Sequence, residues 1–214
     1  MTGAVAGGSA GDEVIPASFP GLTVVSWGLG VDSSAYLVEV LSNPGRYGVD
    51  PRRLIVVHAV VGSEWRSTIA DAEQCVLPLL ADAGVRTVQV ARAGRRDADG
   101  IAVLSDTTSP RWLHREGPWT LADDSRVSGT VPKLSHRRCS LRFKGWPLSQ
   151  WIATALGDQP YRHVLGYSAE ETRRAARDLV YATAMRTPVH PLIEWGGTRA
   201  ACAARLLRAV VVLG

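Results

Sequence analysis

The feature that most constrains the fold of this chain is a short polar loop between an apolar strand and an apolar helix. Residues 22–25 are short, apolar and rich in β-branched side chains, as expected of a buried strand. Residues 26–34 follow as Ser-Trp-Gly-Leu-Gly-Val-Asp-Ser-Ser, and residues 35–41 have the composition of a helix. Glycines let the backbone turn sharply, and the first N–H groups of a helix have no partner within it. The sequence therefore predicts an anion-binding site at the start of this helix, with phosphate as the expected ligand.

Two other phosphate-binding motifs and one purely structural alternative have to be weighed. A Walker loop ends in Gly-Lys-Ser/Thr, but here Gly30 is followed by Val31 and Asp32. A dinucleotide-binding fingerprint has a third glycine or an alanine at the position that Ser33 occupies here. The structural alternative is a tight turn in which Asp32 or Ser33 caps the helix without binding a ligand.

Strand and helix signals alternate along the rest of the chain. Further strands are predicted at residues 54–61, 85–90 and 161–167. Residues 68–83 have apolar side chains at helical spacing. This alternation predicts an α/β protein with three layers, α/β/α, around a mainly parallel sheet. Ligands of such sheets bind beyond the carboxyl ends of the strands, where both Ser26 and Gly62 fall.

Composition narrows the class of protein and its compartment. The 46% hydrophobic and 21% charged residues are typical of a soluble globular protein. A net charge of +4, mostly from arginine, fits a phosphate-rich ligand or RNA, although a GC-rich genome gives the same bias. The three cysteines have no Cys-x-x-Cys spacing, so we expect no disulfide framework. Without a signal-peptide pattern or an apolar run of about 18 residues, we expect a cytoplasmic protein with no membrane partner.

The expected domain organisation is simple. We expect residues 1–20 to form a flexible leader and residues 21–214 to form one α/β nucleotide-binding domain. Residues 91–135, rich in Arg, Asp, Gly and Ser, are expected to be a substrate-side insertion. Within it, Trp112 and Trp119 could stack on a base or substrate ring, or they could fill the core.

The loop resembles the PP-loop of the ATP pyrophosphatases, whose signature is Ser-x-Gly-x-Gly-x-Asp-Ser. The residues that carry the signature here are Ser26, Gly28, Gly30, Asp32 and Ser33. Leu29 stands where many relatives have another glycine, and Ser34 is a further candidate contact. In that superfamily the loop holds the β- and γ-phosphates of ATP while a nucleophile attacks the α-phosphorus. The resemblance implies the adenine nucleotide alpha hydrolase-like, HUP-type fold, with Asp32 capping the helix or holding Mg²⁺.

The second strand resembles the phosphoadenosine phosphosulfate (PAPS) reductase-like branch of the superfamily. That branch has Ala-Asp-Thr-Gly-x-Glu-x-x-x-Thr where this chain has residues 59–68. Gly62, Glu64 and Thr68 are kept, whereas Val60 replaces the aspartate, so any role of that aspartate is absent or relocated. The resemblance implies that Gly62 and Glu64 belong to the site. The alternative for Glu64 is a surface carboxylate near a helix start.

Residues 136–151 resemble the Arg-x-Cys-Ser/Thr-x-x-x-Lys-x-x-Pro segment of the same branch. There an arginine and a lysine reach the nucleotide phosphates, which makes Arg138 and Lys144 catalytic candidates beside Asp32. Fixed cations stabilise the negative charge that develops on departing pyrophosphate. The alternative is a solvated basic turn.

Cys139 lies in that segment, and in some relatives the equivalent cysteine joins later cysteines in an iron–sulfur or zinc site. Here only Cys202 follows, and two thiolates cannot complete a four-thiolate site. We therefore expect no iron–sulfur cluster and no protein-bound metal centre. Either the protein is a short, cluster-free form or a C-terminal part has been lost.

Two later segments also match the family. A Leu-Gly-Tyr-x-x-x-Glu-x-x-Arg pattern implies that Gly166 lies near the adenosine and that Arg174 belongs to the site. Ser168 and Glu171 by themselves predict a capping box at a helix start. The family's Pro-Leu-x-x-Trp segment follows from residue 191, after which Thr198 is predicted to cap the last helix.

The resemblance, which runs from about residue 22 to residue 205, implies an enzyme that binds ATP and Mg²⁺. We expect it to adenylate an unknown small-molecule or RNA acceptor and release pyrophosphate, for later sulfur or nitrogen transfer. Sulfonucleotide reduction is less expected, because the chain has no Glu-Cys-Gly-x-His tail. The alternatives are a non-catalytic nucleotide- or nucleic-acid-binding module and one subunit of a larger complex. A homodimer or a partner subunit is compatible with each of these.

Overall fold

The computed structural model of this chain describes residues 21–130 and 138–213, so the expected leader, residues 1–20, lies outside the described residues. Within the described ranges the chain forms a six-stranded sheet with the order β4-β3-β2-β1-β5-β6. The strands are β1 (Leu22–Ser26), β2 (Leu54–Ala59), β3 (Arg86–Arg92), β4 (Ile101–Thr107), β5 (Tyr161–Leu165) and β6 (Arg186–Val189). All neighbouring strands are parallel except β3 and β4.

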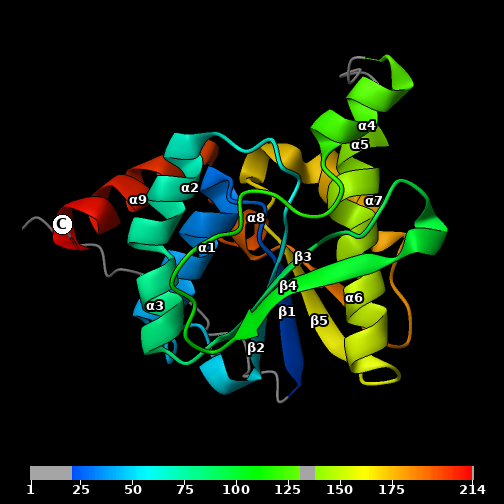
Figure 1. The fold of residues 1–214 in the computed structure, drawn as a ribbon. Helices are drawn as coiled ribbons and strands as arrows, with labels where there is room; N and C mark the ends of the chain where they lie inside the picture. Colours follow the sequence, from blue (N-terminus) through cyan, green and yellow to red (C-terminus); the bar gives the residue numbers. More distant parts are fainter. Residues whose placement is uncertain (1–20, 131–137, 214) are drawn as a thin grey trace, which may run out of the picture.

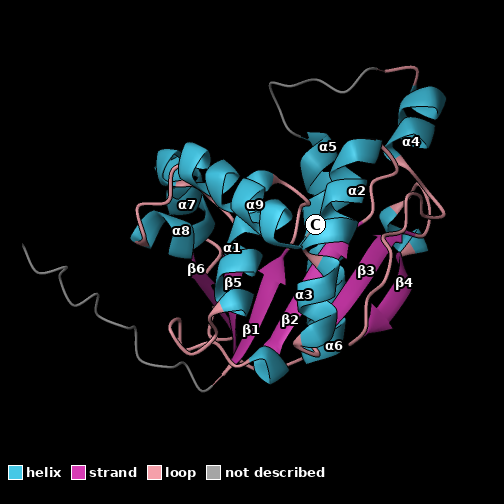
Figure 2. Ribbon diagram, turned by 90° about the vertical axis from the view of Figure 1, so that its left-hand side faces the viewer, coloured by secondary structure: helices cyan, strands magenta, loops and turns pink. Residues whose placement is uncertain are grey.

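Helices cover both faces of this sheet (Figures 1 and 2). One face is covered by α1 (Val31–Ser42), α2 (Arg66–Cys75), α3 (Leu77–Asp82) and α9 (Arg199–Leu213), and the other by α6 (Trp146–Leu156). The shorter helices are α4 (Leu121–Ser128), α5 (Arg138–Ser140), α7 (Thr172–Leu179) and α8 (Pro191–Glu194). The prediction of an α/β protein with a mainly parallel sheet between helical layers is confirmed.

The core divides in the same way, because successive side chains of a strand point to opposite faces. Val25 belongs to the same core cluster as Leu37 of α1, and its neighbour Val24 belongs to the cluster that contains Trp151 and Ile152 of α6. All five side chains are buried. Both faces of β1 are therefore apolar, and this central strand carries the loop of residues 26–34 at its carboxyl end.

The predicted helix of residues 68–83 is two helices, which meet at Val76. Pro78 causes the break, because its ring would clash with the carbonyl four residues earlier in a continuous helix. Pro78 instead occupies the first turn of α3, where a proline is tolerated.

The structure corrects the prediction of a capping box after β5. Ser168 precedes a short 3₁₀ turn (Ala169–Glu171) without a side-chain capping bond, and α7 begins only at Thr172. The Glu171 carboxylate accepts a hydrogen bond from Arg174 and so does not turn back towards Ser168. The cap predicted at Thr198 is confirmed, because its hydroxyl oxygen accepts the N–H of Ala201 at 3.2 Å.

Residues 91–130, the described part of the predicted insertion, contain more regular structure than expected. β4 pairs antiparallel with β3 and closes one edge of the sheet, and α4 lies beyond it (Figure 1). Asp106 of β4 binds Arg86, the first residue of β3, at 2.7 Å and 2.9 Å. The carboxyl end of β4 therefore lies beside the amino end of β3. Among the helices of the described ranges, none has the length and apolar character needed to cross a membrane.

Candidate functional site

The sheet order reverses direction between β1 and β5. From β1 the chain passes through α1 to β2, whereas from β5 it passes through α7 to β6 on the other side. Because such crossovers are right-handed, the two connecting helices lie on opposite faces of the sheet. Ligands of open α/β sheets bind at a switch point of this kind, beyond the carboxyl ends of the strands. The loop of residues 26–34 lies at this point.

The loop is held in place by a buried tryptophan. Trp27 is 1% exposed, its indole N–H donates to the Ser34 hydroxyl at 3.0 Å, and its carbonyl accepts from Nδ1 of His58 at 2.9 Å. Burial lowers the pKa of His58 to about 4, so this imidazole is neutral and keeps a single ring proton for the Trp27 carbonyl. The loop is thus tied both to α1 and to β2 before any ligand arrives.

Backbone strain marks the middle of the loop. Leu29 has a φ of +57°, the left-handed region that costs a non-glycine residue about 1–2 kcal/mol. Its side chain is nevertheless buried, which offsets that strain. A Cβ atom added at Gly28 or Gly30 would meet no described atom within 4 Å, so there is open space beside the loop backbone. Strain of this kind is typical of ligand-binding segments.

The start of α1 has no side-chain cap among the described residues. Its N-cap is Gly30, and the Ser33 hydroxyl donates to the Gly30 carbonyl at 3.2 Å instead of accepting a helix N–H. The capping bond from Asp32 or Ser33 that the structural alternative predicts is therefore not formed. The N–H groups of the first turn and the positive end of the helix dipole suit an anion.

Asp32 lies in this first turn with an incompletely satisfied carboxylate. Its Oδ2 accepts from Arg199 Nη1 at 3.2 Å, whereas the buried Oδ1 has no hydrogen-bond partner among the described residues. Desolvation raises the pKa of Asp32, and the nearby Arg199 lowers it in part. A buried carboxylate oxygen without a partner fits a hard cation such as Mg²⁺. The remaining ligands of such an ion would be phosphate oxygens and water, because no group of three or more acidic, His or Cys side chains suited to a metal occurs in the described residues.

The loop after β5 presses directly against the start of α1. A Cβ atom added at Gly166 would lie 2.6 Å from Cα and 2.7 Å from N of Ser33. Such distances are too short for any side chain, so only glycine fits here. Packing alone accounts for Gly166, and its predicted contact with adenosine stays a prediction.

Glu64 and Lys144, 80 positions apart, meet beyond the carboxyl end of β2. Lys144 Nζ lies 2.8 Å from Glu64 Oε1, and their side chains are 38% and 19% exposed. Glu64 is thus paired rather than solvated. Gly62 just before it has a φ of +77°, and a Cβ atom there would lie 2.5 Å from Cγ2 of Thr120. Three of the predicted site residues are therefore brought to the same edge of the sheet as the loop.

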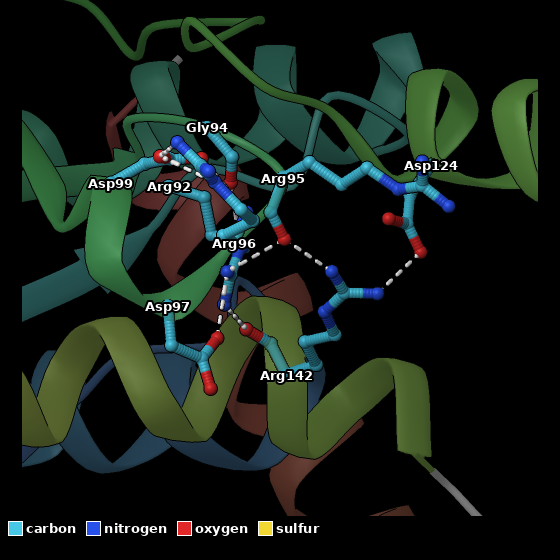
Figure 3. A network of polar contacts seen from close by, with 8 residues as sticks. All are labelled: Arg92, Gly94, Arg95, Arg96, Asp97, Asp99, Asp124 and Arg142. Carbon is cyan, nitrogen blue, oxygen red and sulfur yellow. Dashed lines mark hydrogen bonds and ion pairs between the residues drawn. The ribbon is translucent and has the colours of Figure 1, made fainter.

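A buried arginine that sequence reasoning missed holds the turn that carries Lys144 (Figure 3). Lys144 belongs to a π-helical turn, Leu141–Gly145, a conformation that is frequent at functional sites. Arg92, at the end of β3, is 1% exposed. Its guanidinium donates to the carbonyls of Gly94, Arg95 and Arg142 at 3.2, 3.1 and 3.4 Å, and to the Asp97 carboxylate at 2.8 Å.

Arg142, which lies in the π-helical turn, also links this turn to the loop after β3. It donates to the Arg95 carbonyl and to the Asp124 carboxylate of α4, the latter at 2.8 Å (Figure 3). The ring of Trp146 lies 4.4 Å from the Arg92 guanidinium and completes its surroundings. The only sequence signal for Arg92 is a charge at the end of an apolar strand.

The remaining predicted residues are Arg174, Arg138, Trp112 and Trp119. Arg174 binds Glu171 and stacks 4.5 Å over the ring of Tyr167, with its side chain 43% exposed. Arg138 begins α5, but its side chain lies outside the described part of the chain. Trp112 is 61% exposed, and Trp119 is partly buried.

Comparisons of the chain with protein-family models, with curated proteins and with solved structures find no match. The geometry at the carboxyl edge of the sheet therefore carries the functional proposal.

The raised pKa of Asp32 predicts how substitution of this residue changes stability at different pH values. Because the pKa of its carboxyl is higher in the folded chain than the ordinary 3.8, ionisation favours the unfolded state. The free energy of unfolding therefore falls as the pH rises from 3.8 through the higher pKa that this carboxyl has in the folded chain. We expect Asp32→Asn to raise the free energy of unfolding at pH 7 in urea titrations, with the gain vanishing near pH 3. The exposed Asp71→Asn should change it by less than about 0.5 kcal/mol at either pH. A loss of stability in Asp32→Asn at pH 7 would contradict this description of the carboxylate.

Arg92 gives a second prediction. A lysine cannot reproduce the guanidinium fork, so Arg92→Lys should lose most of these hydrogen bonds and destabilise the fold by about 2–4 kcal/mol. The matched control is Arg96→Lys on the same loop, whose side chain is 80% exposed, with an expected loss below about 0.5 kcal/mol. Urea unfolding of both variants measures the difference. Equal stabilities would show that Arg92 does not hold the π-helical turn.

Proposed function

We propose that this chain is a PP-loop, HUP-type enzyme that binds ATP with Mg²⁺ at the start of α1 and cleaves it between the α- and β-phosphates. The observation that carries the proposal is the orphaned, buried Oδ1 of Asp32 beside an uncapped helix start. An anion alone would be repelled by that carboxylate, whereas a phosphate that brings a divalent cation satisfies both features at once.

Each residue of the site has a distinct role in this proposal. The backbone of Gly28 and Gly30 and the hydroxyls of Ser26, Ser33 and Ser34 would face the phosphates, and Asp32 would hold the Mg²⁺ that ATP carries. Mg²⁺ supplies charge neutralisation on the phosphate oxygens. An acceptor oxygen attacks the α-phosphorus and forms a bond to it. The bond between the α-phosphorus and the oxygen that bridges to the β-phosphate breaks, and pyrophosphate leaves with the electron pair of that bond.

In this proposal Lys144 stabilises that leaving group. Its partner Glu64 holds it at the carboxyl edge of the sheet, and its side chain is open enough to turn towards a ligand. Fixed cations facing a departing pyrophosphate act in the transition state. Arg138 and Arg174 would add charge from α5 and α7. In this proposal the acceptor is a small molecule or an RNA, and the enzyme is cytoplasmic.

A second candidate function is a non-catalytic nucleotide-binding module or a subunit of a larger complex. Two observations favour it: Val60 is buried and apolar where the PAPS reductase-like branch has an aspartate, and Lys144 is already paired in the free chain. This candidate predicts tight nucleotide binding without turnover.

The test is the product pattern from Mg-ATP, with pools of candidate acceptors added. We expect AMP and pyrophosphate from the wild type, and a fall in turnover of at least about 100-fold in Lys144→Ala, the loss typical of removing a transition-state charge partner. Asp32→Asn should be similarly impaired although folded. Arg177→Ala, an exposed cation on α7, is the matched control and should keep wild-type turnover.

The other product patterns decide between the alternatives. ADP and phosphate would contradict cleavage between the α- and β-phosphates. Tight ATP binding without any product would favour the non-catalytic module.

A further inference from the structure

A chain of buried polar groups ends at the hydroxyl of Ser26, the first residue of the loop. Ser26 Oγ lies 2.8 Å from Nε2 of His163 on the neighbouring strand β5. The opposite ring nitrogen, Nδ1 of His163, lies 2.8 Å from Nε of Arg186 on β6. None of the functions proposed above for the loop uses His163 or Arg186.

The direction of these hydrogen bonds follows from the chemistry of the groups. A guanidinium N–H can only donate, so Nδ1 of His163 must accept from Arg186. A neutral imidazole then carries its one proton on Nε2, which donates to Ser26 Oγ. Burial, followed by the charge of Arg186, lowers the pKa of His163 to about 3, so the imidazole stays neutral near pH 7.

This direction excludes one familiar role for a serine–histidine pair. A histidine that activates a serine nucleophile accepts the hydroxyl proton on the nitrogen that faces it. Here that nitrogen already carries a proton and donates. Ser26 is therefore not activated as a nucleophile by His163.

Arg186 is itself fixed, so the direction cannot easily reverse. Its guanidinium binds Asp178 Oδ1 at 2.6 Å and the Tyr181 carbonyl at 3.2 Å. The other oxygen of Asp178 lies 3.1 Å from Nε2 of His190. The charged and titratable groups that face His163 are therefore Arg186, Asp178, His190 and the ring of Tyr161, 6.0 Å away. Because Asp178 balances the charge of Arg186, the main effect of this network on Ser26 is to fix which atoms donate hydrogen bonds, and its net charge matters less.

The direction of these hydrogen bonds determines what the Ser26 hydroxyl can do. A hydroxyl has one hydrogen to donate, and His163 does not need it, so the Ser26 hydrogen is left to donate to another group. We propose that His163 is a positioning residue that makes Ser26 a hydrogen-bond donor to a phosphate at the start of α1, and that Arg186 fixes the required tautomer. This inference rests on the proposed phosphate site and adds the two residues that orient one of its donors.

The first half of the test is spectroscopic and needs no ligand. The ¹⁵N shifts of the His163 ring in labelled protein distinguish the two neutral tautomers. We expect a protonated Nε2 and an unprotonated Nδ1 at pH 7. The opposite tautomer would overturn the inference.

The second half is a double-mutant cycle with inorganic pyrophosphate and Mg²⁺ as the probe. Loss of one hydrogen bond typically weakens binding about 3–10-fold, so His163→Leu should weaken pyrophosphate binding by that factor in the wild-type background. In the Ser26→Ala background the same change should have no effect. His163→Gln keeps an N–H donor and should recover most of the affinity, and a native-like spectrum of this variant controls for misfolding.

Each further outcome decides between the two proposals. Equal effects of His163→Leu in both backgrounds, or no recovery in a folded His163→Gln, would overturn the positioning role while leaving the phosphate site intact. Absence of pyrophosphate and ATP binding in the wild type would overturn both.

Discussion

The candidate site depends on one buried side chain, the indole of Trp27. Trp27 occupies the first position after β1. Its indole N–H ties the loop to α1 through Ser34, and its main-chain carbonyl ties the loop to β2 through His58. Without these bonds the glycines on either side of Leu29 would leave the loop many conformations, and ordering it on ligand binding would cost about 1–2 kcal/mol per residue. Trp27 therefore keeps the loop ordered, with its backbone accessible at the carboxyl edge of the sheet, before a phosphate binds.

The same edge of the sheet collects features that are unfavourable in the free chain. Leu29 is strained, Oδ1 of Asp32 is buried without a partner, and the positive end of α1 has no cap among the described residues. Features of this kind oppose folding and persist where the rest of the structure is stable enough to hold them. They occur within four positions of one another, whereas the core layers on both faces of β1 are apolar and closely packed. This contrast is the physical basis for placing the function at the loop.

Local patterns predicted the parts of the structure that depend on neighbours in the chain. The strand, loop and helix around Gly30, the alternation of the later elements and the cap at Thr198 each follow from a few adjacent residues. Local patterns could not predict Arg92, whose partners are loop carbonyls and a turn 50 positions away. The pairing of Ser26 with His163 spans 137 positions and depends on strand order, which spacing alone does not determine. The break between α2 and α3 is also local, because Pro78 interrupts the helical spacing of residues 68–83.

The central claim is that phosphate binds where α1 begins. The most direct measurement is the ¹⁵N–¹H spectrum of the labelled protein during titration with Mg²⁺ and inorganic pyrophosphate. The account predicts that the largest amide shifts occur in residues 28–34 and at Gly166, which packs against Ser33. A small hollow lined by Tyr36, Tyr47 and Trp195 lies near the opposite, amino ends of β1 and β5 and provides the internal comparison. Shifts centred on that hollow, or an unchanged spectrum at millimolar pyrophosphate, would contradict the account.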